Sequence, residues 1–257
     1  MSAACRSWVN YWTQDACAKA FWSQQELPAY RRLLADTVAW LDPRPGECWL
    51  DLGCGSGALT RAVWEKSAGQ VAEIIGLDCA AINEKAYRHL RATVQPPATA
   101  ERIRFVMGDF SQGLDQWPDA YFNGVMSGMA IQYAESYAAA TARWTTDAYD
   151  RLLRDVYRLL RPGGRFVFSV NVPKPAWERL ALGLLVGAVT ARRPARHLRR
   201  GWLMYHYGQW LNREARRGRF HYLPAQQVVH RLTAAGFVDI RRRTSYSGLA
   251  YVLRCRK

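Results

Sequence analysis

The chain has 257 residues, of which 49% are hydrophobic and 22% charged, a composition typical of one globular domain with a sizeable core. It contains no run of roughly 20 apolar residues, no apolar signal core at its N-terminus and no C-x-x-C pair among its six cysteines. We therefore expect a cytoplasmic protein that has neither a membrane span nor a metal site.

The net charge of +15 is unevenly distributed along the chain. Residues 1–150 include 13 basic and 17 acidic residues, whereas residues 151–257 include 23 and 4. The second part therefore carries all of the positive excess. Such a field attracts polyanions, anionic lipid surfaces or acidic substrates, and charge alone does not discriminate among them.

Residues 1–45 precede the first predicted core strand and are rich in aromatic residues at helix-like spacing. We interpret them as an N-terminal helical cap that packs on the rest of the molecule. The domain proper begins at residue 46, after the turn Asp42-Pro43-Arg44-Pro45-Gly46.

The most informative stretch is residues 48–57, in which a short apolar strand ends at Asp51 and turns through Gly53, Gly55 and Gly57 into a helix. Glycines at this spacing let the backbone approach a ligand closely, and the N–H groups of the following helix point at it. The stretch predicts a nucleotide-like ligand at the carboxyl end of the strand.

The chemistry of that ligand is indicated by Asp51. Gly53, Gly55 and Ala58 also satisfy the looser G-x-G-x-x-G/A dinucleotide fingerprint, so a nicotinamide cofactor stays open on this motif alone. A carboxylate at the end of the strand attracts an ammonium group and repels a pyrophosphate. Asp51 therefore favours a ligand with an amino group.

Strands and helices continue to alternate along the chain, which predicts a doubly wound α/β sheet. Asp78 ends the second strand, 21 positions after Gly57, where a carboxylate can bind both ribose hydroxyls. The other strands are predicted over 103–107, 121–127, 165–168 and 238–240, with a C-terminal strand around Cys255. Helices are predicted over 58–67, 80–94 and 134–161, with a last helix that ends near 235.

Residues 172–222 form an insert between the fifth strand and the last helix. Within it, residues 180–200 join an apolar segment to a cluster of arginines, a combination typical of an interfacial contact with an anionic membrane. A buried helix that closes a pocket explains the same pattern, and both interpretations stay open.

Five of these motifs together resemble the class I S-adenosylmethionine-dependent methyltransferases of the small-molecule type. They are Asp-Leu-Gly-Cys-Gly-Ser-Gly at 51–57, Gly-Leu-Asp at 76–78, Gly-Asp-Phe at 108–110, Leu-Leu-Arg-Pro-Gly-Gly at 159–164 and Ala-Gly-Phe at 235–237. The resemblance implies a seven-stranded sheet, mostly parallel with an antiparallel C-terminal strand, and helices on both faces. The family often has Asp where this chain has Asn123, so no base is expected there.

The resemblance also implies which residues serve the reaction. The cofactor, S-adenosyl-L-methionine, is expected to contact Asp51, Gly53, Cys54, Gly55, Gly57, Asp78, Cys79, Gly108, Asp109, Phe110 and Ser127. The acceptor is expected near Tyr11, Trp12, Tyr205 and Tyr207, with His206, His221 or Tyr133 as a candidate base. Because histidine and tyrosine suit a hydroxyl acceptor, we expect O-methylation of a small, lipophilic molecule.

Two other functions are weighed against this one. An RNA-directed methyltransferase would explain the basic second part, but no RNA-binding module and no Pro-Cys nucleophile pair is present in the sequence, so nucleic acid is not expected as a partner. A non-catalytic protein that binds an adenosyl cofactor is disfavoured because all the cofactor motifs are intact.

Overall fold

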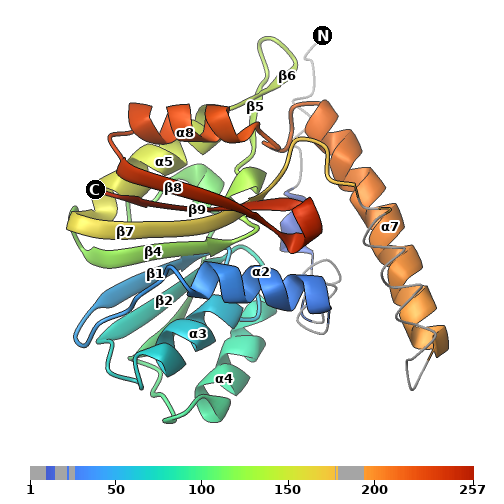
Figure 1. Ribbon diagram of the computed structural model, residues 1–257. Coiled ribbons are helices and arrows are strands. Elements are labelled where there is room, and N and C mark those ends of the chain that lie inside the picture. Colours follow the sequence, from blue (N-terminus) through green and yellow to red (C-terminus); the bar gives the residue numbers. More distant parts are fainter. Residues whose placement is uncertain (1–9, 15–21, 23–26, 177, 179–193) are drawn as a thin grey trace, which may run out of the picture.

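The computed structural model describes residues 10–14, 22, 27–176, 178 and 194–257 (Figure 1). Its centre is a seven-stranded sheet in the order β3-β2-β1-β4-β7-β9-β8. The strands are β1 (Cys48–Leu52), β2 (Glu73–Asp78), β3 (Ile103–Met107), β4 (Phe122–Gly128), β7 (Leu160–Asn171), β8 (Val238–Ser245) and β9 (Ala250–Arg256). Within this sheet, β9 runs in the direction opposite to the other six strands and is antiparallel to both of its neighbours, β7 and β8. The predicted fold class is confirmed.

Helices cover both faces of the sheet (Figure 1). One face is covered by α2 (Pro28–Val38), α3 (Ala58–Lys66) and α4 (Asn83–Thr93), and the other by α5 (Asp147–Leu159) and α8 (Ala225–Ala234). The predicted crossover helices at 58–67 and 80–94 are thereby confirmed within a few residues.

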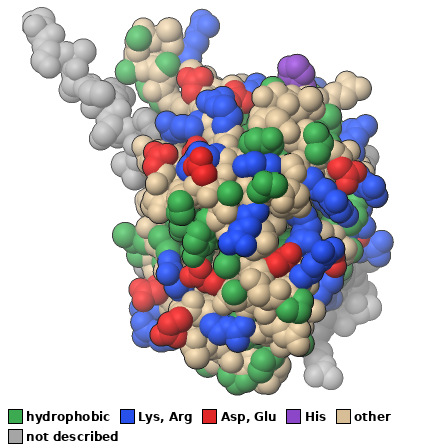
Figure 2. Space-filling model, turned by 90° about the vertical axis from the view of Figure 1, so that its left-hand side faces the viewer, with side chains coloured by type: hydrophobic (Ala, Val, Ile, Leu, Met, Phe, Trp, Pro, Cys, Tyr) green, Lys and Arg blue, Asp and Glu red, His purple; other side chains and the backbone are tan. Residues whose placement is uncertain are grey.

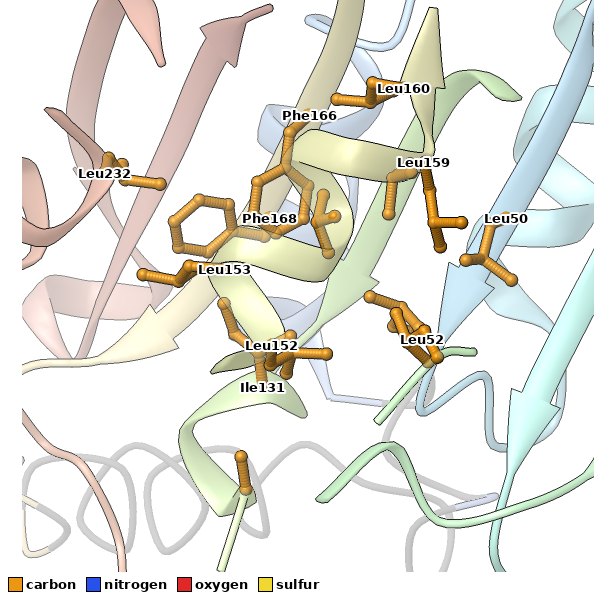
Figure 3. Close-up of a cluster of buried hydrophobic side chains, with 14 of the residues drawn as sticks. Leu50, Leu52, Ile131, Leu152, Leu153, Leu159, Leu160, Phe166, Phe168 and Leu232 are labelled. Carbon is orange, nitrogen blue, oxygen red and sulfur yellow. The ribbon is translucent and has the colours of Figure 1, made fainter. Parts of the chain in front are cut away.

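Alternation along the strands supplies a separate apolar core to each face. On β1, Trp49 packs with the α3 and α4 side chains, whereas Leu50 packs with those of α5 and α8. Figure 3 shows the second of these cores, in which Phe166 and Phe168 of β7 stack at 4.4 Å between their ring centroids. The two cores fix the twist and register of the sheet, and its carboxyl edge is left for the loops.

The predicted helix over 134–161 is wrong in its first part. Residues 136–145 form a hairpin of β5 (Ser136–Ala138) and β6 (Arg143–Thr145), and α5 begins only at Asp147. The Ala-rich run offers no apolar stripe with a helical period, whereas Tyr137 and Trp144 pack across the hairpin at 5.1 Å between ring centroids.

The cap and the insert are described only in part. Within the cap, the structure describes the short 3-10 helix η1 (Tyr11–Thr13) and α2. Within the insert, it describes α7 (Pro194–Arg216) but not residues 179–193. Of residues 180–200, those up to 193 lie outside the described part, and from 194 only the helical backbone is described. No helix in the described part is long and apolar enough to cross a membrane.

The excess of positive charge counted in the sequence does not form a basic patch on the face seen in Figure 2. Lys and Arg side chains lie there among Asp and Glu and between apolar groups. Charge on this face therefore gives no separate indication of a polyanion site.

Candidate functional site

The glycine turn after β1 brings three segments together. The N–H groups of Gly53 and Cys54 donate to the Leu77 carbonyl at 2.8 and 3.1 Å, which joins the end of β1 to β2. Gly53 has φ +65°, and a Cβ there would lie 2.2 Å from the Cβ of Ala130, in the loop after β4. A Cβ on Gly55, at φ +51°, would meet no atom of the described residues within 4 Å. The backbone at Gly55 therefore borders open space at the carboxyl edge of the sheet.

Asp51 lies buried beneath this turn. Its Oδ2 accepts hydrogen bonds from the backbone N and the Oγ1 of Thr60, at 3.2 and 2.8 Å. The Thr60 hydroxyl in turn contacts the Tyr87 hydroxyl at 2.7 Å. Burial raises the pKa of Asp51 to about 7 in spite of these bonds. A nearby cation would therefore stabilise the ionised form of this carboxylate.

Asp78 occupies the matching position at the end of β2. Its carboxylate accepts hydrogen bonds from the N–H groups of Gly55 and Ala80, both at 2.9 Å. Burial raises the pKa of Asp78, and the nearby Asp109 carboxylate adds to that effect. The Asp78 carboxylate is thus held against the glycine turn.

Asp109 follows β3 and is contacted by the cap. Its Oδ1 accepts from the N–H of Ser111 at 2.8 Å, and its Oδ2 accepts from Nδ2 of Asn10 at 2.9 Å. The Oδ1 of Asn10 also accepts from the N–H of Trp12 and so caps η1. The three adjacent strands β1, β2 and β3 each have a carboxylate at or just beyond the carboxyl end, and together these form an acidic edge suited to a ligand rich in donors and positive charge.

The other residues predicted to contact the cofactor surround the same turn. A Cβ on Gly53 would lie 3.3 Å from the Phe110 ring, whereas one on Gly108 would lie 2.9 Å from the Leu77 side chain. The Ser127 hydroxyl is fully buried and donates to the Leu52 carbonyl at 2.8 Å, so it joins β4 to β1. A direct contact of Ser127 with the cofactor stays a prediction.

Two cysteines adjoin the carboxylates. Cys54 is buried and Cys79 is half-buried. Burial, reinforced by Asp78, raises the pKa of both thiols, so both stay protonated at neutral pH. This favours packing beside the ligand over a nucleophilic role.

An aromatic cluster lies beyond the loop that follows β4, and we call it the acceptor-side cluster. The Tyr133 ring packs against Trp12 of the cap at 4.4 Å and against Phe220 at 4.8 Å, between ring centroids. The Tyr11 ring packs against Trp210 of α7 at 4.3 Å. The remaining members include Leu33, Tyr207, Leu211, Tyr222, Tyr246 and Leu249.

Hydroxyl groups meet inside this cluster. The Tyr133 and Tyr222 hydroxyls lie 3.1 Å apart, and Nδ2 of Asn171, at the carboxyl end of β7, lies 3.5 Å from the Tyr133 hydroxyl. Burial raises the pKa of both tyrosines. They are therefore neutral phenols near pH 7, and a role of Tyr133 as a base stays a prediction.

The two candidate histidines lie in different surroundings. His221 is buried, with Nε2 2.8 Å from the Ala134 carbonyl, and burial lowers its pKa. His206 lies on the exposed side of α7, packed on Trp202 at 4.2 Å between ring centroids. The structure thus brings Tyr11, Trp12, Tyr133 and Tyr207 together, and it leaves His206 and Tyr205 on the outer side of the helix.

Four residues of the site were not predicted from the sequence. Asn10 and Tyr30 come from the cap; burial, and next the Asp51 carboxylate, raise the pKa of Tyr30 to about 12. Asn171 and Tyr222 supply the polar atoms beside Tyr133. Asn171 had a usable signal, because it ends a strand in the same way as Asp51 and Asp78.

Among the described residues, no group of three or more His, Cys, Asp and Glu side chains is placed to hold a metal ion. The acidic edge and the open position at Gly55 instead fit an organic cofactor that carries an amino group, ribose hydroxyls and an adenine. This is the donor-rich chemistry of S-adenosylmethionine.

Comparison with known proteins agrees with this geometry. Residues 21–241 match the model of a methyltransferase domain. The chain is 35% identical over 165 residues to the nocamycin O-methyltransferase of Saccharothrix syringae. This alignment covers 63% of this chain and 50% of that protein. It is 31% identical over 153 residues to the demethylmenaquinone methyltransferase of Symbiobacterium thermophilum. That alignment covers 58% of this chain and 52% of that protein.

The matched region thus spans about half the length of these two curated relatives. In fold, the chain resembles an S-adenosylmethionine-dependent methyltransferase from Mesorhizobium loti with a TM-score of 0.55 at 20% identity, over 87% of this chain and 96% of that one. With the domain match covering most of the sequence, the chain belongs to the class I S-adenosylmethionine-dependent methyltransferases.

Proposed function

We propose that the protein transfers a methyl group to an oxygen atom of a small, flat acceptor that binds at the acceptor-side cluster. The observation that carries this proposal is the position of Tyr133. It lies three residues beyond Ala130, and the Cβ of Ala130 lies against the glycine turn. Aromatic rings with hydroxyl groups among them suit a flat acceptor that has a polar substituent.

On this proposal the acidic edge holds the cofactor. Asp51 faces its amino group, Asp78 its ribose and Asp109 its adenine, while Gly55 leaves room for its backbone contact. S-adenosylmethionine supplies an electrophilic methyl group on a sulfonium ion. What this chain adds is alignment of the acceptor and exclusion of water by the cap rings.

Removal of a proton from the acceptor requires a base, and the candidate bases of the acceptor-side cluster are poorly suited to that role. Tyr133 and Tyr222 are neutral, and His221 is neutral with one ring nitrogen held by a backbone carbonyl. This set suits an acceptor whose hydroxyl is itself acidic, such as a phenol or an enol. His206 stays a weaker candidate base, because its side chain faces outward.

Transfer to carbon is a second candidate. It is favoured by the likeness to a demethylmenaquinone methyltransferase, whereas the nocamycin relative is named an O-methyltransferase. An electron-rich hydroxylated ring would bind in the same cluster for either reaction.

The acceptor can be identified by mass spectrometry. Cell extract is incubated with the enzyme and methyl-labelled cofactor, and products that gain the label are analysed for O–CH3 or C–CH3 bonds. A labelled aromatic ether supports the proposal, and a ring-methylated product supports the second candidate. Labelled RNA or a labelled peptide as the sole product would contradict both.

We further propose that the acceptor is lipophilic and reaches the enzyme from an anionic membrane surface. The support is the sequence of residues 180–200 together with Trp202, whose side chain is 61% exposed on α7. Flotation with anionic and neutral liposomes tests it at low salt. Preferential binding to the anionic vesicles that weakens in salt supports it, and negligible binding to both contradicts it.

A further inference from the structure

Four polar side chains form the centre of the acceptor-side cluster, and we call them the polar centre. They are Gln132, Tyr133, Asn171 and Tyr222. Hydrogen bonds from Tyr222, Gln132 and Asn171 lower the pKa of the Tyr133 hydroxyl, although burial outweighs them. Gln132 and Asn171 are both completely buried.

The two amides use only their nitrogen atoms. Nε2 of Gln132 donates to the Met129 carbonyl at 3.0 Å, and Nδ2 of Asn171 approaches the Tyr133 hydroxyl at 3.5 Å. The amide oxygens of Gln132 and Asn171 are inaccessible to solvent and have no hydrogen-bond partner in the described part of the chain. Both orphaned atoms are acceptors, and both belong to side chains that border the same hydroxyl.

Such orphaned oxygens are unusual, because a buried carbonyl without a donor loses its hydration and gains nothing in return. Asn123 shows the ordinary arrangement in this chain, since its Oδ1 accepts from the N–H of Cys48 at 3.0 Å. Unlike Asn123, the two amides of the polar centre have an oxygen that no donor of the described residues satisfies, which leaves a place for donors of a ligand.

We propose that the amide oxygens of Gln132 and Asn171 read hydrogen-bond donors on the acceptor, which is therefore a flat ring that carries at least two hydroxyl or N–H groups. This inference deepens the proposed function and rests on it. The Trp12 ring packs on Tyr133 at 4.4 Å between ring centroids, so an acceptor ring beside the polar centre would also lie near Trp12. A diol binds in this manner, whereas its ether or quinone form, which has acceptors only, does not.

The inference also bears on product release. Methylation of a hydroxyl oxygen replaces its O–H bond with an O–CH3 bond, and the proton goes to solvent. The product then lacks one of the two donors, so one amide oxygen is again left without a partner. The ether therefore binds more weakly than the diol from which it forms.

Two probes with the same ring test whether the amide oxygens accept hydrogen bonds from the acceptor. We would measure the binding of 1,4-dihydroxynaphthalene and of 1,4-dimethoxynaphthalene by quenching of tryptophan fluorescence, without oxygen and with saturating S-adenosylhomocysteine. We expect the diol to bind at least about tenfold more tightly, because sites built to bond a hydroxyl reject analogues that lack it.

Variants assign the effect to the two oxygens. Asn171→Leu and Gln132→Met replace each amide with an apolar group of similar size, and we expect each to lower the diol preference to about threefold or less. Each replacement removes one nitrogen hydrogen bond together with an oxygen that has no donor among the described residues, so the melting temperature should change little. Asn123→Leu is the matched control; it should lower the melting temperature and keep the preference.

The outcomes separate this inference from the function beneath it. If neither naphthalene binds while S-adenosylhomocysteine does, both the flat-acceptor proposal and this inference fail. If the two probes bind equally well, the flat acceptor stands and the reading of donors is overturned. If the Asn171 and Gln132 variants keep the preference for the diol, the amide oxygens do not bind donors of the acceptor, and the inference is again overturned.

Discussion

The acidic edge and the acceptor-side cluster lie side by side in the fold but are built in different ways. At the acidic edge, each carboxylate ends a strand and takes a hydrogen bond from a residue nearby in sequence, such as Thr60 for Asp51 or Ser111 for Asp109. In the cluster, Trp12 contacts Tyr133, and Tyr133 contacts Tyr222, over separations of about 90 residues or more. Both regions form on folding, but each carboxylate of the first has a hydrogen-bond donor close to it in the chain, whereas the contacts of the second join distant residues.

Because of this difference, the two regions tolerate sequence changes to different degrees. The glycine turn needs positive φ angles and a gap at particular positions, so few sequences can form it. The cluster needs only rings and polar atoms of suitable size, which many sequences can supply from the cap and α7. We therefore expect cofactor binding to depend on single residues and acceptor choice to depend on several together.

The largest effect is expected for Gly55→Val. A Cβ at Gly55 would meet no atom within 4 Å among the residues that the structure describes, so the added side chain would occupy the space assigned to the cofactor. We expect S-adenosylhomocysteine affinity, measured by calorimetry, to fall at least about 100-fold, or roughly 2.7 kcal/mol. Gly46→Val is the control, because Gly46 has φ +75° and is equally open but lies before β1. Equal loss of affinity in both variants would place the effect in backbone strain.

Asp78→Ala tests the second carboxylate and should have the next largest effect. Removing a charged hydrogen-bonding group from a bound ribose costs about 1.5–3 kcal/mol of binding. The cofactor-free protein should keep its melting temperature, because burial already disfavours the Asp78 carboxylate. Affinity equal to that of the parent protein would show that the ribose lies elsewhere.

Asp51 makes cofactor affinity depend on pH. Its pKa is about 7 in the folded protein and about 4 in an unfolded chain, so the folded state retains a proton that the unfolded state releases between these values. The contribution of Asp51 to the free energy of unfolding therefore falls as pH rises from about 4 to 7. A cofactor ammonium group needs the ionised form, so affinity should rise up to about tenfold per pH unit and level off above pH 7.

Asp51→Asn provides the control for this profile. Calorimetric titrations of the variant between pH 5.5 and 8.5 should lose most of the slope. A slope that persists unchanged would assign the proton to Asp78, whose pKa is also raised.

The local character of the acidic edge explains why the sequence predicts it well. Asp51, Asp78 and Asp109 follow apolar runs, and parallel strands necessarily bring such residues to one edge. The hairpin over 136–145 was missed because its stability comes from the pairing of Tyr137 with Trp144 and from contacts to α5, which an Ala-rich run does not reveal. Asn10 was missed for a similar reason, since its partner Asp109 lies 99 residues away.

Asn10→Ala probes a side chain that joins the two regions, and its effect should be the smallest. Nδ2 of Asn10 holds the Asp109 carboxylate, and Oδ1 of Asn10 caps the helix that carries Trp12. Loss of these bonds should weaken S-adenosylhomocysteine binding by about 1 kcal/mol, or roughly fivefold. Thr13→Val is the matched control, because the Thr13 hydroxyl bonds only the Asn10 carbonyl, at 2.8 Å, and the change should leave affinity unaltered. Tighter binding by Asn10→Ala would mean that Asn10 competes with the cofactor for Asp109, and the cap would then oppose cofactor entry instead of supporting it.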